Sequence, residues 1–299
     1  MIGVSFLLTV YNKAAYLPAV LSAVRGQTGD FAREIVIVDD GSTDESLAVA
    51  RRVTQGWADV RIVAQTNAGA SAAMNRAAEE ARLTYLKLVD SDDLLTPSAT
   101  ALLLRALTET KAVMAVGQAQ PYDYRSIPST ATDDPEWRGS RVIIDSLAAT
   151  LHTSRYNPSV MLLQREDYFA VGGCDPDVTC QEYSLSLPLA LRGDFVEIPN
   201  IVAYVARGDS NRLSASAKRE LANITKATLN FVRRHPNLPM RYRRIALKKA
   251  AGRARLWAQR HGASGGPWPY IWHHALAQMP LPVDHARGIE ECLRAFEEK

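Results

Sequence analysis

Three carboxylates, Asp90, Asp92 and Asp93, follow directly on an apolar stretch of the sequence. Carboxylates this close repel one another, and each raises the pKa of the next unless a cation compensates. A hard divalent cation takes carboxylate oxygens and often keeps open positions for the phosphates of a substrate. The cluster is therefore a candidate site for a metal and a phosphate-bearing ligand. An acidic turn ahead of a helix is the alternative, because Thr96-Pro97 is a favourable helix start.

Strand and helix patterns alternate ahead of this cluster and just beyond it. Short apolar runs at residues 4–10, 34–38, 60–63, 86–89 and 112–116 predict strands, and the stretches between them favour helices. Because these runs are apolar on both faces, we expect an α/β fold in which helices flank a mostly parallel sheet. Ligands of such sheets bind outside the carboxyl ends of the strands.

Polar residues follow each of the first four predicted strands. Tyr11 follows the first strand, Asp39 and Asp40 end the second, and Asn67 comes after the third. The acidic cluster that starts at Asp90 ends the fourth. We therefore expect four strand ends to converge on one crevice, and this convergence favours a binding site over an acidic turn.

Taken in order, these motifs resemble the family 2 inverting glycosyltransferases of GT-A fold. The resemblance covers roughly residues 1–205 and lies in Thr9-Val-Tyr-Asn12, Val38-Asp-Asp-Gly-Ser-Thr-Asp44, Asn67-x-Gly69 with Asn75, Asp90-Ser-Asp-Asp93 and Gly172-Gly-Cys-Asp175. It implies a GT-A domain over residues 1–213, with a nucleotide-sugar-binding half (1–118) and an acceptor-binding half (119–213). Residues 214–299 would form a basic helical extension.

The resemblance also implies roles for the strand-end residues. A nucleotide-sugar, UDP-linked by preference, would contact Thr9, Tyr11, Asp39, Asp40, Asn67, Gly69, Asp90 and Asp92. The family's Asp-x-Asp element coordinates Mn²⁺ or Mg²⁺ bridging the diphosphate, which stabilises charge on the departing nucleoside diphosphate. We expect Asp93 to be the direct metal ligand and Asp92 to be the next.

Inversion requires a base that deprotonates the acceptor hydroxyl on the side opposite the leaving group. The family places this carboxylate in a Glu-Asp pair that opens a helix after the Gly-Gly-x-Asp turn. The corresponding residues here are Gln181 and Glu182, so the resemblance assigns the catalytic base to Glu182. An ordinary acid in the first turn of a helix is the alternative for Glu182.

Three positions depart from the family's pattern. Gln181 stands in place of an acid, Pro188 stands where Arg is common, and Met74 replaces an Arg that lies near the diphosphate in many relatives. Arg207 or Arg212 could supply the missing positive charge. These departures motivate a rival function, a non-catalytic member that binds nucleotide-sugar or glycan. A sugar nucleotidyltransferase is a second rival, but it requires a Gly-rich phosphate loop that the N-terminal sequence lacks.

The acceptor is expected to be a hydroxyl of a glycan or a lipid-linked molecule, as in polysaccharide biosynthesis. Residues 120–157 lose periodicity and gain Pro, Ser, Thr and Asp, and a loop this long is usually functional or mobile. Within it, Tyr122 and Trp137 could stack on an acceptor sugar, although generic loop aromatics are the alternative. Gly173 and Asp175 of the Gly-Gly-x-Asp turn are further candidates for acceptor contact.

The C-terminal region is strongly basic. Between residues 221 and 283 there are eleven Lys or Arg and no acid, whereas the rest of the chain holds 24 Lys or Arg and all 32 acids. This composition fits a solvated helical cap. With Trp257, Trp268, Tyr270 and Trp272, it also fits a peripheral contact with an anionic membrane. Nucleic-acid binding is the least favoured interpretation.

The sequence shows no signal for export or for crossing a membrane. No apolar run approaches the roughly 18 residues that a spanning helix needs, and the N-terminus lacks a basic signal-peptide region. The three cysteines show neither metal-ligand spacing nor a disulfide framework, which suits a reducing compartment. We expect a cytoplasmic protein, peripheral at most to the inner face of the membrane.

Overall fold

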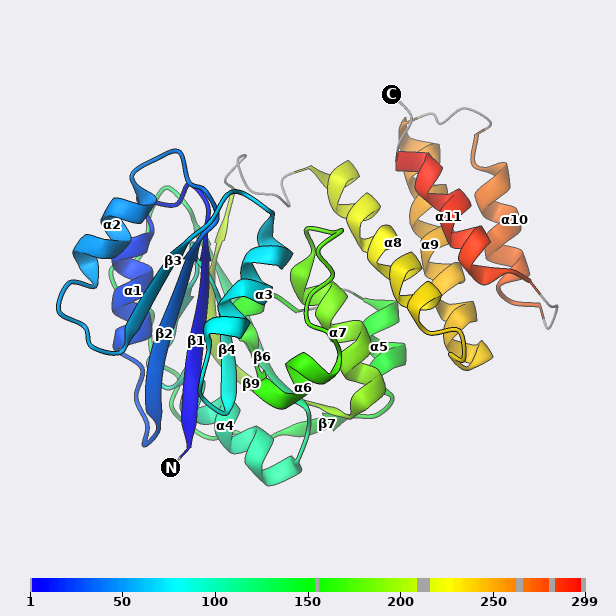
Figure 1. The fold of residues 1–299 in the computed structure, drawn as a ribbon. Coiled ribbons are helices and arrows are strands. Elements are labelled where there is room, and N and C mark those ends of the chain that lie inside the picture. Colours follow the sequence, from blue (N-terminus) through cyan, green and yellow to red (C-terminus); the bar gives the residue numbers. More distant parts are fainter. Residues whose placement is uncertain (1, 154–155, 209–215, 262–265, 280–282, 297–299) are drawn as a thin grey trace.

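The computed structural model describes residues 2–153, 156–208, 216–261, 266–279 and 283–296. Its centre is a nine-stranded sheet in the order β3-β2-β1-β4-β8-β6-β9-β5, with β7 paired to β9 (Figure 1). The four N-terminal strands run parallel: β1 (Gly3–Val10), β2 (Ala32–Asp39), β3 (Val60–Ala64) and β4 (Tyr85–Asp90). The other strands are β5 (Leu94–Leu95), β6 (Met114–Asp123), β7 (Arg141–Ile143), β8 (Met161–Gln164) and β9 (Phe195–Arg207). The mostly parallel N-terminal half confirms the predicted α/β fold.

Helices lie on both sides of the parallel strands, as the two-faced apolar runs predict. In Figure 1, α1 and α2 lie on one side of the sheet and α3 on the other. These helices, together with α4 beside β6 and β9, have the following bounds: α1 (Leu17–Arg25), α2 (Ser46–Val53), α3 (Ala70–Glu80) and α4 (Ala99–Thr110). The strands between them are buried on both faces, because Phe6, Leu7 and Leu8 of β1 are all inaccessible to solvent.

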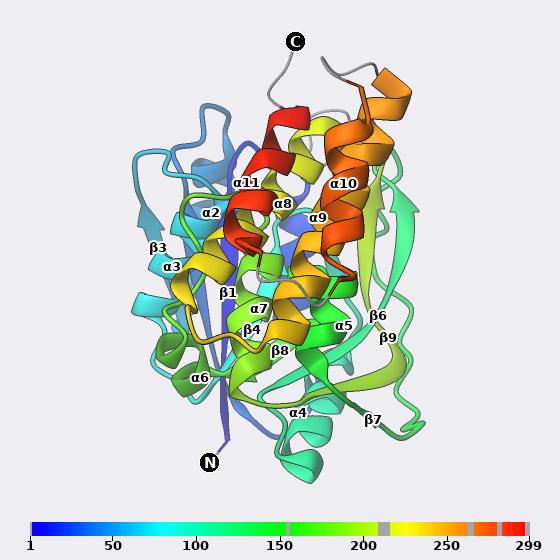
Figure 2. The ribbon, with the colours of Figure 1, turned by 90° about the vertical axis from the view of Figure 1, so that its right-hand side faces the viewer.

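The C-terminal helices build a second hydrophobic core with parts of the preceding region. This core contains residues of two helices that precede residue 213, α5 (Ser146–His152) and α7 (Gln181–Arg192). It also contains the C-terminal helices α8 (Ala217–Arg234), α9 (Met240–His261), α10 (Trp268–Leu276) and α11 (His285–Leu293). Leu151 of α5 and Leu187 of α7 belong to one core with residues of α8 and α9, and the ribbons of these four helices are seen in Figure 2. The predicted boundary between residues 213 and 214 lies outside the described residues. Helices α8 to α11 are therefore packed onto α5 and α7 by a shared core.

The stretch 120–157 is more ordered than its composition predicts. Strand β6 continues to Asp123, and β7 and α5 follow within the stretch. The physical reason is long-range pairing, since β6 runs parallel to β9 from Met114 beside Phe195 to Asp123 beside Arg207. The remaining short elements are the 3-10 turn η1 (Pro158–Val160), helix α6 (Arg165–Ala170) and the 3-10 turn η3 (Arg294–Phe296). No helix in the described part of the chain is both long and apolar enough to span a membrane.

Candidate functional site

The parallel strands bring their polar ends together. The register pairs Val10 of β1 with Asp39 of β2, and Thr9 of β1 with Asp90 of β4. Asp39 in turn lies opposite Ala64 at the end of β3. The four strand ends therefore form one edge of the sheet, at the top in Figure 1, and the predicted convergence is confirmed.

The acidic cluster at the end of β4 is compact. Asp90, Asp92 and Asp93 each offer a carboxylate oxygen, and these oxygens lie within 4.8 Å of one another. Asp93 is fully buried, Asp92 is nearly so, and Asp90 is half-buried. Lys13, just beyond β1, donates from Nζ to Asp92 Oδ2 at 2.8 Å. The Tyr122 hydroxyl donates to the Asp92 carbonyl at 2.7 Å.

A buried lysine lies beneath this cluster. Lys87 of β4 is fully buried, and its Nζ donates to the carbonyls of Leu88 at 2.9 Å and Ser159 at 2.5 Å. Burial lowers the pKa of Lys87 to about 7, although the negative charges of Asp93 and Asp90 oppose this shift. Sequence reasoning missed this residue. The available signal was a single lysine within an otherwise apolar predicted strand.

The donor set of the cluster suits a hard divalent cation. Three carboxylates supply only oxygen ligands, which Mg²⁺ and Mn²⁺ prefer over nitrogen or sulfur. Lys13 neutralises part of their charge, and burial holds Lys87 only partly protonated near neutral pH. Three carboxylates held this close together are therefore a group that a divalent metal could bind.

Asp39 and Asp40 have different surroundings although they are adjacent and both buried. Asp40 accepts hydrogen bonds from Gln65 Nε2 and Ala68 N at 2.8 Å, and from Gly69 N at 2.9 Å. Its carboxylate thereby fixes the loop that carries Asn67, where Gly69 has a φ of +90°. Asp40 therefore positions the loop between β3 and α3.

Asp39, in contrast, keeps one oxygen available. Its Oδ1 accepts from Ser42 N at 3.0 Å, while its buried Oδ2 has no hydrogen-bond partner among the described residues. A buried acceptor without a partner is costly, which makes this oxygen a candidate for receiving a ligand N–H or O–H. Thr9, which pairs with Val38 and Asp90 in the register, is partly exposed, and the Tyr11 side chain is 48% exposed.

Gln181, which replaces an acid, contacts the acidic cluster directly. Its Nε2 donates to Asp90 Oδ1 at 3.2 Å, and Asn157 Nδ2 donates to Asp90 Oδ2 at 3.2 Å. Only the amide nitrogen can face a carboxylate, so the amide orientation follows from its partner. The Gln181 Oε1 atom is buried without a partner among the described residues. A neutral donor thus stands where an acid would add a fourth negative charge.

Glu182 lies next along α7 and is half-buried. Burial raises its pKa to about 7, and the negative charge of Glu220, in the first turn of α8, acts in the same direction. A carboxylate with such a pKa can accept a proton near neutral pH, which a general base must do. These electrostatics are compatible with the predicted catalytic base.

The Gly-Gly-x-Asp turn docks on helix α3 through Asn75. The Asn75 amide donates to the Cys174 carbonyl at 2.9 Å, and its oxygen accepts from Cys174 N at 2.8 Å and from the Tyr168 hydroxyl at 2.6 Å. Gly173 has a φ of +73°, and a Cβ there would lie 2.6 Å from Asn75 Oδ1. A side chain at residue 173 would therefore collide with Asn75, so the turn requires glycine at this position.

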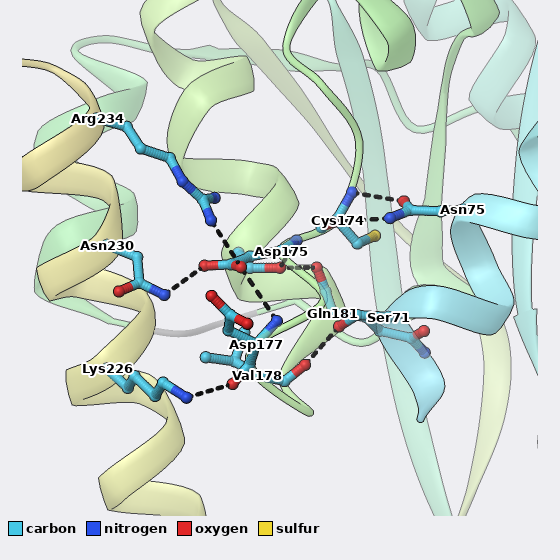
Figure 3. Close-up of polar contacts among 11 residues, drawn as sticks. Ser71, Asn75, Cys174, Asp175, Asp177, Val178, Gln181, Lys226, Asn230 and Arg234 are labelled. Carbon is cyan, nitrogen blue, oxygen red and sulfur yellow. Dashed lines mark hydrogen bonds and ion pairs between the residues drawn. The ribbon is translucent and has the colours of Figure 1, made fainter. Parts of the chain in front are cut away.

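Asp175 ends that turn and joins it to α8. Figure 3 shows the Asp175 carboxylate accepting from Asn230 Nδ2 at 2.7 Å and from Arg234 Nη2 at 2.9 Å. Close by, Lys226 Nζ donates to the Asp177 carbonyl at 2.8 Å. Although burial opposes it, hydrogen bonding to Asn230 and Arg234 holds the pKa of Asp175 below its ordinary value. A contact of Asp175 with the acceptor stays a prediction. The structure shows contacts of its carboxylate with α8.

The two predicted acceptor aromatics occupy different places. Tyr122 is mostly buried, and only its hydroxyl reaches the acidic cluster. Trp137 packs against the main core, and the Arg105 guanidinium of α4 lies 4.3 Å from its ring centroid. The role of both rings toward an acceptor stays a prediction.

The departure at residue 74 has a structural consequence. Met74 is fully buried in the main core, so this position cannot present charge to a diphosphate. Arg207 lines a hollow of about 370 Å³ together with Pro121, Tyr122, Asp123, Tyr124, Arg125 and Gly208. That hollow adjoins the cluster, because Tyr122, which lines it, donates from its hydroxyl to the Asp92 carbonyl. Arg212 lies outside the described residues.

Comparison with solved structures defines the class of fold. S. aureus TarS (residues 1–349) in complex with UDP-GlcNAc superposes with a TM-score of 0.61 at 14% identity, covering 97% of this chain and 91% of that one. A mannosyltransferase, PcManGT from Pyrobaculum calidifontis, in complex with GDP-Man and Mn²⁺, gives 0.60 at 18% identity, covering 98% and 85%. The fold is therefore the GT-A fold of glycosyltransferases.

Sequence comparison identifies the family. Residues 5–169, more than half of the chain, match Glycosyl transferase family 2, and the chain belongs to this family. The putative glycosyltransferase EpsH of Bacillus subtilis (strain 168) is 36% identical over 103 residues, 34% of this chain and 30% of EpsH. The chondroitin synthase of Pasteurella multocida (strain Pm70) is 34% identical over 113 residues, 38% of this chain and 12% of that enzyme.

Proposed function

We propose that this protein is a metal-dependent inverting glycosyltransferase that moves a sugar from a nucleotide-sugar, UDP-linked by preference, to a hydroxyl of a glycan or lipid-linked acceptor. The observation that carries the proposal is the compact carboxylate cluster at the end of β4, in a family 2 chain with a GT-A fold. Structures of similar fold that hold UDP-GlcNAc, or GDP-Man with Mn²⁺, support it. The similar chondroitin and hyaluronan synthases support a role in polysaccharide biosynthesis.

Donor binding would use the strand ends. The unpartnered Asp39 Oδ2 accepts from a nucleobase N–H or a ribose hydroxyl, beside Thr9 and Tyr11. Asp40 holds the loop with Asn67 and Gly69 in place, so that loop borders the donor. Each charge-assisted bond of this type is shorter and stronger than a neutral one.

Asp90, Asp92 and Asp93 would hold Mn²⁺ or Mg²⁺, with Asp93 as the direct ligand and Asp92 as the next. When bound, such a metal supplies charge neutralisation for the departing diphosphate. Lys13 orients Asp92 through its ion pair, and Gln181 and Asn157 fix the two oxygens of Asp90. These contacts set the carboxylates before any ligand arrives.

Glu182 would act on the acceptor. As the acceptor oxygen forms its bond to the anomeric carbon and the bond to the diphosphate breaks, the hydroxyl proton passes to the Glu182 carboxylate. Attack from the side opposite the leaving group inverts the anomeric centre. A pKa of about 7 lets Glu182 be substantially ionised near neutral pH and still basic enough to take this proton.

A donor panel tests the proposal. The protein is incubated with UDP-, GDP- and dTDP-sugars, glycan and lipid-linked acceptors, and Mn²⁺ or EDTA, and release of nucleoside diphosphate is measured. We expect release with at least one UDP-sugar, lost in EDTA. Donor binding without release for every acceptor would favour the non-catalytic alternative. The absence of both binding and release would exclude a glycosyltransferase.

We further propose a peripheral contact with anionic membranes through α10. Trp268 and Trp272 are 74% and 60% exposed, and their spacing of four residues places them on one face of this helix. Exposed tryptophans beside a basic region suit the interface of an anionic membrane. Sedimentation with phosphatidylglycerol vesicles should carry wild type but not Trp268→Ala/Trp272→Ala, and phosphatidylcholine vesicles should carry neither. Equal sedimentation of wild type and variant with phosphatidylglycerol would contradict this contact.

A further inference from the structure

A second hollow lies between the first turns of α8 and the last turns of α9. Its volume is about 420 Å³, and it is lined by Ser216, Ala217, Lys218, Leu221, Arg253, Leu256, Trp257, Arg260 and His261. Three of these residues are cationic, and none of the nine is acidic. The hollow is therefore a concave surface of one charge sign, which concentrates anions.

Arg253 is partly buried, and its hydrogen-bond partners among the described residues are hydroxyls. Its Nε donates to Thr225 Oγ1 at 3.2 Å, and its Nη2 lies 3.5 Å from Thr228 Oγ1. Among the described residues, no carboxylate forms an ion pair with it, whereas Arg233 and Arg234 of α8 each have one. Burial lowers the pKa of Arg253, because the charged guanidinium loses contact with water there. An anion in the hollow would compensate that charge.

The remaining wall is apolar and aromatic. Leu221 and Leu256 line the hollow, and Leu256 is 45% exposed. The Trp257 ring stacks on the His261 ring with centroids 3.7 Å apart and planes 16° apart. The occupant that fits both surfaces therefore carries an anionic group next to a ring or an apolar chain.

The hollow is connected to helix α7, which carries the proposed base. Arg253 interacts electrostatically with Cys180, which precedes α7, and with Tyr183, which follows Glu182 in that helix. The Tyr183 hydroxyl also lies 3.2 Å from Thr228 Oγ1, which contacts Arg253. In Figures 1 and 2, α8 begins and α9 ends toward the same end of the molecule as the carboxyl ends of the parallel strands.

We propose that this hollow binds a phosphate group of the acceptor and holds the acceptor hydroxyl near Glu182. The planar guanidinium groups of Arg253 and Arg260 can bind phosphate oxygens in pairs. The acceptor's ring or chain would lie against Leu221, Leu256 and Trp257. The acceptor role rests on the proposed glycosyltransferase function, whereas the anion site itself does not.

Calorimetric titration with inorganic pyrophosphate tests the anion site. EDTA is present, so that no metal occupies the carboxylate cluster. Arg260→Gln and Arg253→Lys should each weaken pyrophosphate binding at least tenfold. The control is Lys248→Gln, which removes one charge from α9 outside the hollow and should leave pyrophosphate binding unchanged. Arg260 is exposed, so its variant should fold even where the Arg253 variant does not. Equal binding by wild type, Arg260→Gln and Lys248→Gln, or no binding by wild type, would overturn the site.

Two further arms identify the source of the phosphate. Displacement of pyrophosphate by phosphatidic acid vesicles but not by phosphatidylcholine vesicles indicates a lipid phosphate, whereas displacement only by a soluble glycosyl phosphate indicates a free one.

In turnover, Arg260→Gln should raise KM for a glycosyl phosphate acceptor and leave donor KM and kcat unchanged. An unchanged acceptor KM overturns the acceptor role. Pyrophosphate binding that Arg260→Gln abolishes, in a protein with no turnover, supports the site and overturns the glycosyltransferase function.

Discussion

At the scale of single residues, the charge balance of the acidic cluster decides what the site can bind. Asp90, Asp92 and Asp93 carry up to three negative charges within a few ångströms. Lys13 compensates one of them, and Lys87, with a pKa of about 7, is only about half protonated at neutral pH. Three carboxylates this close together favour a divalent cation over a purely structural acidic turn.

Asp93→Asn should abolish metal-dependent turnover and weaken Mn²⁺ binding, because it removes a full charge and a ligand oxygen with little change in shape. Calorimetric titration with Mn²⁺ and measurement of nucleoside diphosphate release check this outcome. Asp59→Asn is a matched control, since it alters a surface ion pair with Arg25 on another part of the chain. Near-normal Mn²⁺-dependent activity of Asp93→Asn would refute the assignment of the metal ligand.

Glu182→Gln should lose turnover while donor binding persists, because an amide cannot accept the acceptor proton. In wild type, kcat/KM should rise with pH through about 7 and then level off, since the base works only when ionised and its pKa is raised to about 7. A pH profile of nucleoside diphosphate release, with donor affinity measured separately, checks both statements. If Glu182→Gln keeps the wild-type rate and profile, the base lies elsewhere.

At the scale of elements, the position of the proposed base, Glu182, depends on contacts with the neighbouring helix α3. Helix α3 holds the Gly-Gly-x-Asp turn through Asn75, and Ser71 of the same helix donates to the Val178 carbonyl at 2.6 Å (Figure 3). The segment 172–178 leads directly into α7, whose first residues are Gln181 and Glu182. The position of the proposed base is therefore set from α3 through this turn.

Gly173→Ala should destabilise the fold more than Gly172→Ala. Both glycines have positive φ (+73° and +83°), so each substitution carries the left-handed strain of about 1–2 kcal/mol. Only at Gly173 would the new Cβ meet Asn75 Oδ1, at 2.6 Å, whereas nothing lies within 4 Å at Gly172. Disturbing the Asn75 hydrogen bonds adds about 1–3 kcal/mol. Urea unfolding measures the difference, and equal losses would mean that Asn75 does not hold the turn.

Helix α8 should tune the proposed base through Glu220. Glu220→Gln removes a like charge, so the pKa of Glu182 should fall and the rise of kcat/KM should move to lower pH. Burial is the larger cause of the raised pKa, so the shift should be partial. Glu136→Gln, an exposed change on a loop away from α8, is the control. An unmoved pH profile for Glu220→Gln would show that the two carboxylates do not interact.

At the scale of the whole molecule, the basic C-terminal helices are part of the body that carries the site. They share a hydrophobic core with α5 and α7, and Asp175 ties the Gly-Gly-x-Asp turn to α8 (Figure 3). Loss of this attachment should therefore disturb α7 as well as α8. Arg253 of the cationic hollow contacts Thr228 of α8, which in turn lies 3.2 Å from the Tyr183 hydroxyl of α7.

Asp175→Asn should lower the free energy of unfolding by about 1–3 kcal/mol at pH 7, because it weakens the charge-assisted bonds from Asn230 and Arg234. The folded-state pKa of Asp175 is depressed, so its contribution is present above the unfolded pKa of about 4. It is lost as the pH falls through the lower, folded value.

Urea unfolding at several pH values should thus show wild type and Asp175→Asn converging below about pH 4. Asp177→Asn, the same change at an exposed neighbour, should stay within about 0.5 kcal/mol of wild type throughout. A constant difference across the pH range, or an equal loss in both variants, would contradict the role of Asp175.

The sequence by itself determined the α/β alternation, the convergence of strand ends and the candidate carboxylates. Runs such as residues 4–10 and 34–38 are apolar on both faces, and only a buried parallel sheet satisfies such runs. Once the strands are parallel, their polar ends must share an edge, so the sequence pattern alone suffices to group Asp39 with Asp90. The order of apolar runs and the polar residues that follow them predicts this grouping, because strand formation here depends on residues that are close together in the sequence.

Only the tertiary structure decided what each polar residue faces. Asp39 and Asp40 are adjacent and alike in sequence, yet Asp40 is bonded to the loop at residues 65–69 and Asp39 keeps a buried oxygen available. The order within residues 120–157 depends on pairing with β9, and the uncompensated charge of Arg253 depends on α8. These properties arise from contacts between residues far apart in the sequence, which no local periodicity encodes.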